Sequence, residues 1–372
     1  MAKICQNFIQ RFSFAIALRN ITLSVHAAMP ASATKRALIA LAALVCLAAA
    51  AAAIYLYRAR RPLPAIAPSI LPIPSVLSEL PPDAPGIAYL DVAALRRLQG
   101  SPLAAMLGLV GASPASDRDY ADFVRGTGFD YTRDLDKAAI AFWPASRIGP
   151  AGIFDRGVVI AEGRFDQAKI KAYALRTGHV ITRGNESIYV VPGSPPDAFE
   201  FLAPTRIILA SGKDPASLLG PFKPGPRDSV IQALMDRVAA APVFAVARTD
   251  NPPPAFYTNF SSSPQLEQLA RNIQGLTFAG QPKADDLELA LDARCDSMTH
   301  AVEMSTLLEG FRMIGSMALA DPKTRREMTR DELALATAVL AQAKLTHQDR
   351  WVRLTLEVTP TMLGSSGADP KP

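Results

Sequence analysis

A single uncharged segment, residues 37–57, constrains this chain more than any other feature. Its 21 residues contain no charged side chain, and a helix of that length, rising 1.5 Å per residue, covers the roughly 30 Å hydrocarbon core of a bilayer. Lys35 and Arg36 precede the segment, three arginines follow it, and Tyr55 and Tyr57 stand near its end, at the headgroup level that aromatic rings favour. We therefore expect a transmembrane helix at residues 37–57, with the lipid bilayer as the partner of that helix.

Two other interpretations of this segment start from its small residues. Alanines at 48–53 have the A-x-A spacing of a signal-peptidase site, so the segment could instead be a cleaved signal peptide. Cleavage would leave residues 54–57 at the new N-terminus, and these residues continue the apolar run into an aromatic belt, which favours retention. A lipoprotein signal is disfavoured because Val45, directly before Cys46, departs from the small residue that such signals carry there.

Residues 1–36 form the N-terminal tail in front of the membrane segment. Residues 1–28 contain no proline, glycine or acidic residue, and the composition changes just before Met29. We interpret Met29 as the initiator, because MPASATKR followed by the apolar run makes a compact signal-anchor. The alternative is that the basic stretch FIQRFSFAIALRNITL is an organellar transit peptide or an amphipathic surface helix.

The orientation and location follow from the position of the anchor. Positive charges on its two sides are almost balanced, so the positive-inside rule does not decide the orientation. A membrane segment so near the start most often acts as an uncleaved export signal. We therefore expect a single-pass protein of the bacterial inner (cytoplasmic) membrane, with a cytoplasmic N-terminus and a periplasmic or extracellular C-terminal domain.

The charge of the exported part excludes one class of partner. The whole chain carries a net +5, but all acidic residues lie beyond Arg61, so residues 62–372 carry a net −3. Nucleic-acid binding needs clustered cations that displace counterions. The exported part has no basic stripe, and we therefore expect no nucleic acid among its partners.

Proline content and length set the domain boundaries. Eight prolines stand among the 24 residues from Pro62 to Pro85, a spacing that favours extended polyproline II, so residues 58–85 are predicted to be a semi-rigid stalk. The chain beyond is long enough for a sizeable core, which we divide into units 86–225 and 226–360, followed by a disordered tail at 361–372. Cys295 is the one cysteine between residues 86 and 360, so packing must stabilise this part without an internal disulfide.

Hydrophobic patterning predicts an α+β fold with the same order of elements in both units. The order is strand, helix, two strands, helix, two strands, which resembles two split βαβ, ferredoxin-like units, each an antiparallel sheet with helices on one face. In the last strand, Val352, Leu354, Leu356 and Val358 share one face. Strands are predicted at 87–92, 137–143, 157–163, 179–182, 187–191, 205–211, 241–247, 276–281, 287–293 and 351–358. Helices are predicted at 94–98, 117–125, 167–177, 264–272, about 304–314 and 333–343.

Three segments carry a family resemblance: LPPDAPGIAYLDVAAL, GFDYTRDLDKAAIAFW and RIILASGKDPASLL. They resemble segments of a loose group of uncharacterised, membrane-anchored bacterial proteins of unknown function. The resemblance covers most of residues 80–360 and implies neither an activity nor a functional residue.

No catalytic, cofactor-binding or metal-binding residue is predicted, and no cofactor. None of His26, His179, His300 and His347 has a second ligand at a metal-binding interval. No G-x-S-x-G occurs, the S-x-x-K of Ser32–Lys35 precedes the anchor, and Gly212-Lys213 lacks the upstream glycine of a phosphate loop, where Ile207 stands. The acid pairs could bind a cation, but near predicted turns and helix starts they are more typical of solvated carboxylates: Asp117/Asp119, Asp134/Asp136 and Asp285/Asp286.

The sequence therefore favours a noncatalytic binding or scaffold role in the cell envelope, with an unknown envelope protein, lipid or polymer as the partner. Phe256, Tyr257 and Phe260 would line a groove for that partner, although an ordinary loop also accounts for them. The alternative is a hydrolase-like envelope enzyme whose active residues come together from distant loops. A concave pocket in which two titratable residues converge would favour the enzyme.

Overall fold

The computed structural model describes residues 74–97, 118–149, 152–220, 222, 227–249, 270–283 and 286–359. The predicted tail 1–36, the membrane segment 37–57, most of the stalk and the tail 361–372 lie outside these residues. Among the described residues, no helix is long and apolar enough to span a bilayer. The membrane anchor stays a prediction.

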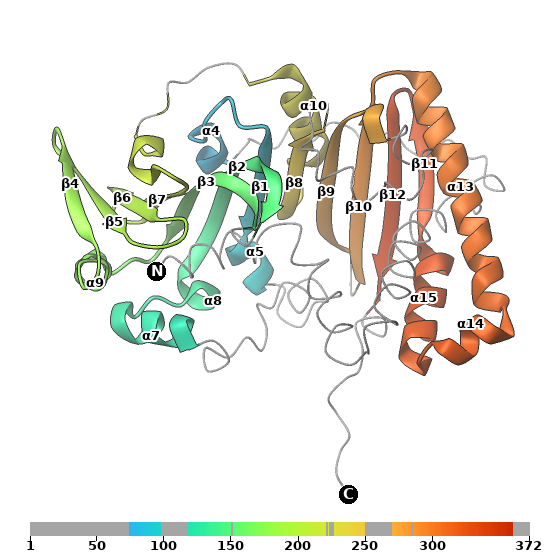
Figure 1. The fold of residues 1–372 in the computed structure, drawn as a ribbon, viewed down its shortest axis with the longest axis horizontal. Helices are drawn as coiled ribbons and strands as arrows, with labels where there is room; N and C mark the ends of the chain where they lie inside the picture. The colour runs from blue at the N-terminus through green and yellow to red at the C-terminus, as the bar shows by residue number, and fades with distance from the viewer. Residues whose placement is uncertain are drawn as a thin grey trace, which may run out of the picture.

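Twelve strands of the described chain form one continuous antiparallel sheet (Figure 1). In space the strand order is β11-β12-β10-β9-β8-β1-β2-β3-β7-β6-β5-β4. The strands are β1 (Gly86–Asp91), β2 (Leu135–Gly149), β3 (Gly152–Gly163), β4 (His179–Arg183), β5 (Glu186–Val191), β6 (Asp197–Ala203), β7 (Arg206–Ser211), β8 (Val243–Arg248), β9 (Ile273–Lys283), β10 (Asp286–Cys295), β11 (Lys344–Gln348) and β12 (Trp351–Val358).

The two halves of this sheet repeat one arrangement. The order β1-β2-β3-β7-β6 in the first half corresponds to β8-β9-β10-β12-β11 in the second, and the β4–β5 hairpin is an addition to the first half. The halves join where β1 pairs with β8, with Ala88 opposite Ala245. The α+β prediction is therefore confirmed, but the ferredoxin-like prediction is wrong. In a split βαβ unit another strand lies between the two strands that a helix connects, whereas here β1 pairs directly with β2, and β8 with β9.

Helices cover both faces of the sheet, which also corrects the prediction of helices on one face. On one face, α4 (Ser75–Ser78), the 3-10 helix η2 (Pro215–Leu218) and α10 (Ser229–Val238) pack on alternate side chains that include Ile87 and Tyr89. On the other face, α5 (Val92–Arg97), α8 (Tyr131–Asp134) and α9 (Gln167–Ala174) pack near Leu90 and Ala138, with α7 (Arg118–Thr127) against α9. Two apolar cores therefore sandwich the sheet.

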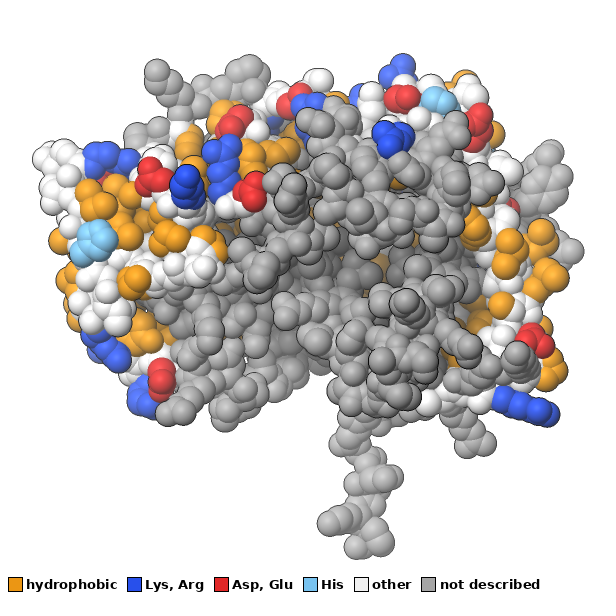
Figure 2. Space-filling view, viewed as in Figure 1, with side chains coloured by type: hydrophobic (Ala, Val, Ile, Leu, Met, Phe, Trp, Pro, Cys, Tyr) orange, Lys and Arg blue, Asp and Glu red, His pale blue; other side chains and the backbone are white. Residues whose placement is uncertain are grey.

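Three helices cover the far end of the second half, where α13 runs along the β11 edge (Figure 1). They are α13 (Met298–Ala320), α14 (Pro322–Glu327) and α15 (Arg330–Gln342). Ala301 and Met304 of α13 are buried against this end of the sheet. The outer side of α13 exposes apolar side chains, which gather at the right of Figure 2. They belong to Met298, Val302, Met313, Ile314 and Met317.

The last part of the predicted stalk is folded onto the sheet. Within residues 74–85, the side chains of Val76, Leu77, Leu80 and Ala84 are buried in the first core. Arg227 donates hydrogen bonds to the carbonyl oxygens of Pro81, at 3.3 Å, and Leu77. These residues therefore belong to the folded domain, and the stalk prediction of 58–85 is wrong for them because their apolar side chains find a core to enter.

A buried ion pair joins the second half of the sheet to α10. The side chain of Asp292 on β10 is fully buried and accepts hydrogen bonds from Arg353 Nε (2.7 Å), Arg353 Nη2 (2.9 Å), Arg237 Nε (3.1 Å) and Thr277 Oγ1 (3.0 Å). The Arg237 guanidinium also lies over the Trp351 ring, 4.5 Å from its centroid. Both carboxylate oxygens are thus paired, as a buried charge requires.

Candidate functional site

A cavity of about 100 Å³ lies between the sheet and helices α7, α8 and α9, in the first half of the chain. Its lining is almost wholly apolar, and it is partly open to the outside. We call it the aromatic pocket. It is lined by Tyr120, Phe123, Phe129, Tyr131, Leu135, Ala161, Phe165, Ile170, Val191, Asp197, Ala198, Phe199, Ile207 and Leu209.

Aromatic rings form a continuous chain along the pocket. Phe129 stacks on Phe165, with centroids 5.1 Å apart and planes at 21°, and Phe165 meets Phe201 edge to face at 6.3 Å. Phe201 in turn meets Phe199 at 5.8 Å and 87°. At the other end, Phe123 contacts Phe129 at 6.3 Å. Offset-stacked and edge-to-face pairs are the arrangements that the ring quadrupole favours, so this lining is held in place by its own contacts.

Helix α7 brings two of these rings to the pocket. Tyr120 and Phe123 are three residues apart, so both lie on one face of the helix. The helix ends at Thr127, whose hydroxyl donates a 2.7 Å hydrogen bond to the Phe123 carbonyl. Gly128 follows in the left-handed region, at φ 73°, and its amide donates to the Val124 carbonyl at 2.7 Å. Glycine takes this conformation without the cost of a Cβ, and the turn aims Phe129 back at the pocket.

The short helix α8 places Tyr131 against the same cavity. Its N-cap is Asp130, whose carboxylate accepts hydrogen bonds from the Thr132 amide (2.9 Å) and hydroxyl (2.7 Å). The Tyr120 hydroxyl donates to the same carboxylate at 2.9 Å and accepts from the Tyr131 amide at 3.2 Å. Burial, followed by the hydrogen bond with Asp130, raises the pKa of the Tyr120 hydroxyl, so it remains protonated and keeps donating.

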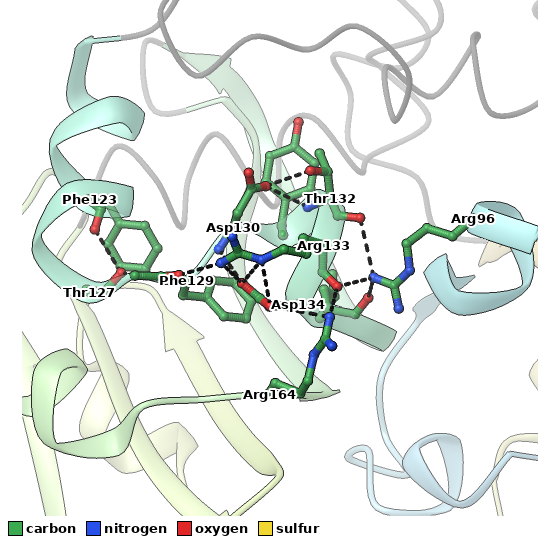
Figure 3. A network of polar contacts seen from close by, with 12 residues as sticks. Arg96, Phe123, Thr127, Phe129, Asp130, Thr132, Arg133, Asp134 and Arg164 are labelled. Atoms are coloured by element: carbon green, nitrogen blue, oxygen red, sulfur yellow. Dashed lines mark hydrogen bonds and ion pairs between the residues drawn. The ribbon is translucent and has the colours of Figure 1, made fainter. Parts of the chain in front are cut away.

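Three arginines fix α8 at the start of β2, beside the end of β3 (Figure 3). Arg96 of α5 donates to the carbonyl oxygens of Arg133 (2.8 Å) and Leu135 (2.7 Å). Arg133 Nη2 contacts the Asp134 carboxylate at 2.6 Å, and Arg164 Nη2 approaches it at 3.4 Å. Burial raises the pKa of Asp134, but the hydrogen bonds from Arg133 and the Asp130 amide and the two nearby cations outweigh it and lower that pKa. This carboxylate therefore stays charged.

The backbone at the end of β3 also approaches α8 closely, at Gly163. A Cβ on Gly163 would lie 2.3 Å from the Asp134 carbonyl oxygen, so only glycine lets the end of β3 reach α8. Phe165, two residues later, then enters the pocket.

Asp197 is the one carboxyl group among the described residues that line the pocket. It begins β6, on the same side of the sheet as Phe199, and its residue is 4 % exposed. Neither carboxyl oxygen has a hydrogen-bond partner in the described structure. Burial raises the pKa of Asp197 to about 7; Ser211, directly opposite on β7, lowers it somewhat by proximity without meeting the geometry of a hydrogen bond. An unpaired buried carboxyl is costly, which makes its position beside an apolar cavity informative.

One of the acid pairs, Asp134/Asp136, lies within the described residues, and both of its carboxylates contact arginines. Asp134 is paired with Arg133, and Asp136 contacts Arg96. Asp117 and Asp285 lie outside the described residues, as does the side chain of Asp119. Among the described residues, no group of three His, Cys, Asp or Glu side chains could hold a metal ion.

The histidines and the Gly212-Lys213 pair do not reach the pocket. His300 contacts the Asp296 carboxylate at the start of α13, and that hydrogen bond raises the histidine pKa. His179 and His347 are exposed on β4 and β11, the two edge strands. Gly212 follows β7. The suggested groove residues Phe256, Tyr257 and Phe260 lie outside the described residues.

The fold and pocket together define an α+β domain with one long antiparallel sheet and an apolar site under one of its helical layers. No protein-family model matches the sequence, and no curated protein is significantly similar to it. The structure is similar to crystal structures of TP0453: form III has a TM-score of 0.42 at 10 % identity, over 77 % of this chain and 95 % of that one. Forms I and IV give 0.41 at 11 %, over 77 % and 94 %. A likeness this distant transfers neither residue roles nor an activity.

Proposed function

We propose that this protein is a noncatalytic binding protein of the cell envelope, held at the bacterial inner membrane by residues 37–57, whose exported domain binds a small apolar group in the aromatic pocket. The observation that carries the proposal is the pocket itself, an aromatic-lined cavity that is partly open and almost free of polar surface. Concave, mainly apolar sites with few polar groups are typical of ligand sites.

The size of the cavity indicates the size of the ligand. An apolar cavity of about 150 Å³ holds benzene, and the space here, about 100 Å³, is smaller. Because it is partly open, it suits the tip of an acyl chain or a ring that projects through the opening. Filling an apolar cavity restores contacts that its lining atoms otherwise lack, so a ligand of this size would be stabilised there.

The chemistry around the pocket supports binding over catalysis. Its described lining offers Asp197 and two tyrosines as titratable groups, and the Tyr120 hydroxyl is directed to Asp130. A general acid and base must each come within hydrogen-bond reach of a reacting group, and no such pair converges among the described lining residues. A hydrolase-like role therefore has no specific observation behind it.

Toluene tests the proposal with the full chain in lipid nanodiscs. Methyl NMR signals of Ile170, Ile207 and Val191 report on the pocket, while Ile231, buried under the opposite face, is the internal control for toluene dissolved in the lipid. We expect saturable shifts at the pocket methyls and none at Ile231. Equal, non-saturating shifts at both places would reject the proposal.

Two pocket-filling variants provide the matched control. Ala161→Leu adds three carbon atoms to the lining, and Leu209→Phe fills the space from a neighbouring strand. A variant that folds should lose the toluene response. If both folded variants bound toluene like the unaltered chain, the ligand would lie elsewhere.

A further inference from the structure

We propose that Asp197 is the polar recognition group of the aromatic pocket, so that the pocket takes small apolar molecules ending in a hydrogen-bond donor, an ammonium or a hydroxyl group. This inference rests on the proposed function and deepens it, because it names the chemistry of the ligand. It also gives a role to the one carboxyl group that the described lining carries.

Asp197 lies on β6, between strands β5 and β7. Cross-strand neighbours of Asp197 are Val191 on β5 and Ser211 on β7. The Asp197 side chain lies on the same face of the sheet as that of Phe199, whose ring is part of the aromatic lining. The carboxyl group therefore stands at the sheet side of the cavity. The Ser211 hydroxyl is close to it but does not meet the geometry of a hydrogen bond.

The Asp197 carboxyl group also lacks hydrogen-bond partners among the described residues. Both of its oxygens are buried without a hydrogen-bond partner in the described structure, and the residue is 4 % exposed. Such groups in native proteins are almost always paired, and each exception calls for an explanation. A donor at the end of a bound ligand supplies the missing partner, whether the carboxyl group is ionised or protonated, because either form keeps an acceptor oxygen.

Cations on the elements around the pocket do not supply that partner. Arg133 and Arg164 are directed to Asp134, and Lys171 on α9 lies over the rings of Tyr189 and Phe201, at 5.9 and 5.3 Å. Each is therefore engaged by another group. An anionic ligand end, by contrast, would place like charges together in an apolar cavity, which is strongly unfavourable.

Four benzyl probes of similar shape test the inference on the full chain in nanodiscs, by the same methyl shifts. They are benzylamine, benzyl alcohol, toluene and benzoate. We expect benzylamine and benzyl alcohol to bind about tenfold or more tighter than toluene, the range expected for a hydrogen bond to a buried charged or unpaired group. We expect benzoate not to bind. The amine and alcohol arms show which donor the pocket prefers.

Substitution of the carboxyl group supplies the control. Asp197→Leu removes the acceptor and keeps an apolar side chain of similar size, so this variant should still bind toluene while losing the preference for the amine and the alcohol. Equal binding of toluene and benzylamine by the unaltered chain would overturn the role of Asp197 and leave the proposed function standing. Failure of toluene to bind the unaltered chain would reject the proposed function itself. An unchanged preference in Asp197→Leu would also overturn the inference.

Discussion

The Tyr120 hydroxyl donates a 2.9 Å hydrogen bond to the Asp130 carboxylate and so ties α7 to the N-cap of α8. The same oxygen accepts the Tyr131 amide at 3.2 Å. Two helices that are joined by a short turn are therefore locked at one oxygen atom. Both helices supply walls of the aromatic pocket.

Tyr120→Phe tests this lock. The change removes one hydroxyl, and we expect the free energy of unfolding to fall by about 1 kcal/mol, the usual net value of a hydrogen bond. Denaturant unfolding of the full chain in detergent measures it. Tyr189→Phe is the matched control, because the Tyr189 ring stacks on Phe199 at 5.1 Å and that stacking survives the change. Equal losses in the two variants would mean that the Tyr120 hydroxyl has no special role.

Asp197 predicts a pH dependence of stability. Its pKa in the folded protein is about 7, above the ordinary 3.8, so between these values the folded state binds more protons than the unfolded state. Stability from this group is therefore full below about pH 4 and is lost as the pH rises to 7, by at most about 1.4 kcal/mol per pH unit. Asp197→Asn cannot titrate, so its stability relative to the unaltered chain should rise between pH 4 and 7 and then level off.

The control for that experiment is Asp83→Asn. Asp83 is an exposed carboxylate in the turn before β1, so its variant should follow the pH profile of the unaltered chain. Unfolding free energies collected from pH 4 to pH 8 make the comparison. A flat difference between Asp197→Asn and the unaltered chain would contradict the raised pKa.

The buried ion pair of Asp292 predicts a large effect from one substitution. Arg353→Met removes two of the hydrogen bonds to a carboxylate that is fully buried, and we expect a loss of about 3–5 kcal/mol, because an uncompensated charge stays inside. Lys169→Met breaks an exposed ion pair with Asp166 and should cost about 1 kcal/mol or less. Thermal unfolding compares the two. A double variant with Asp292→Leu should recover part of the loss.

The last strand offers a comparison of its two faces. Leu354 packs among the side chains under α13, opposite Leu291 and Leu345, whereas Thr355 lies on the other face, opposite Ala290 and Lys344. Leu354→Asp should cost several kcal/mol because it places a carboxylate in the core. Thr355→Asp, beside Lys344, should cost about 0.5 kcal/mol or less. Equal thermal midpoints for the two variants would show that the register is wrong.

The sequence predicts most of the strands because their apolar residues alternate or run together, as in β1, β10 and β12. It misses β6, since Asp197 and Glu200 point to opposite faces and both are buried, so the strand has no polar side. The order of elements also looked ferredoxin-like, because the sequence order does not say whether the strand after a helix lies next to the strand before it or two places away. In the structure β1 pairs directly with β2, and no strand lies between them.

The aromatic pocket could be predicted only in part. Tyr120 and Phe123 share a helical face that the periodicity of α7 indicates. Phe129 and Phe165 lie in turns between elements, where no period assigns a direction. Their stacking brings together residues from before β2 and after β3, which is a consequence of the β2–β3 pairing and of the close approach at Gly163.

During biosynthesis, β1 cannot pair with β8 until the long stretch of chain between them has been made. Ala88 and its partner Ala245 are roughly 150 residues apart in sequence, and a ribosome adding about 5–20 residues per second needs on the order of ten seconds or more to make that stretch. During this time β1 can pair with β2 on one side, but its other edge has no partner. An open edge invites pairing with a second nascent chain. The risk of aggregation is therefore greatest between the synthesis of β1 and that of β8. A chaperone that shields the β1 edge during this interval would raise the yield of folded protein.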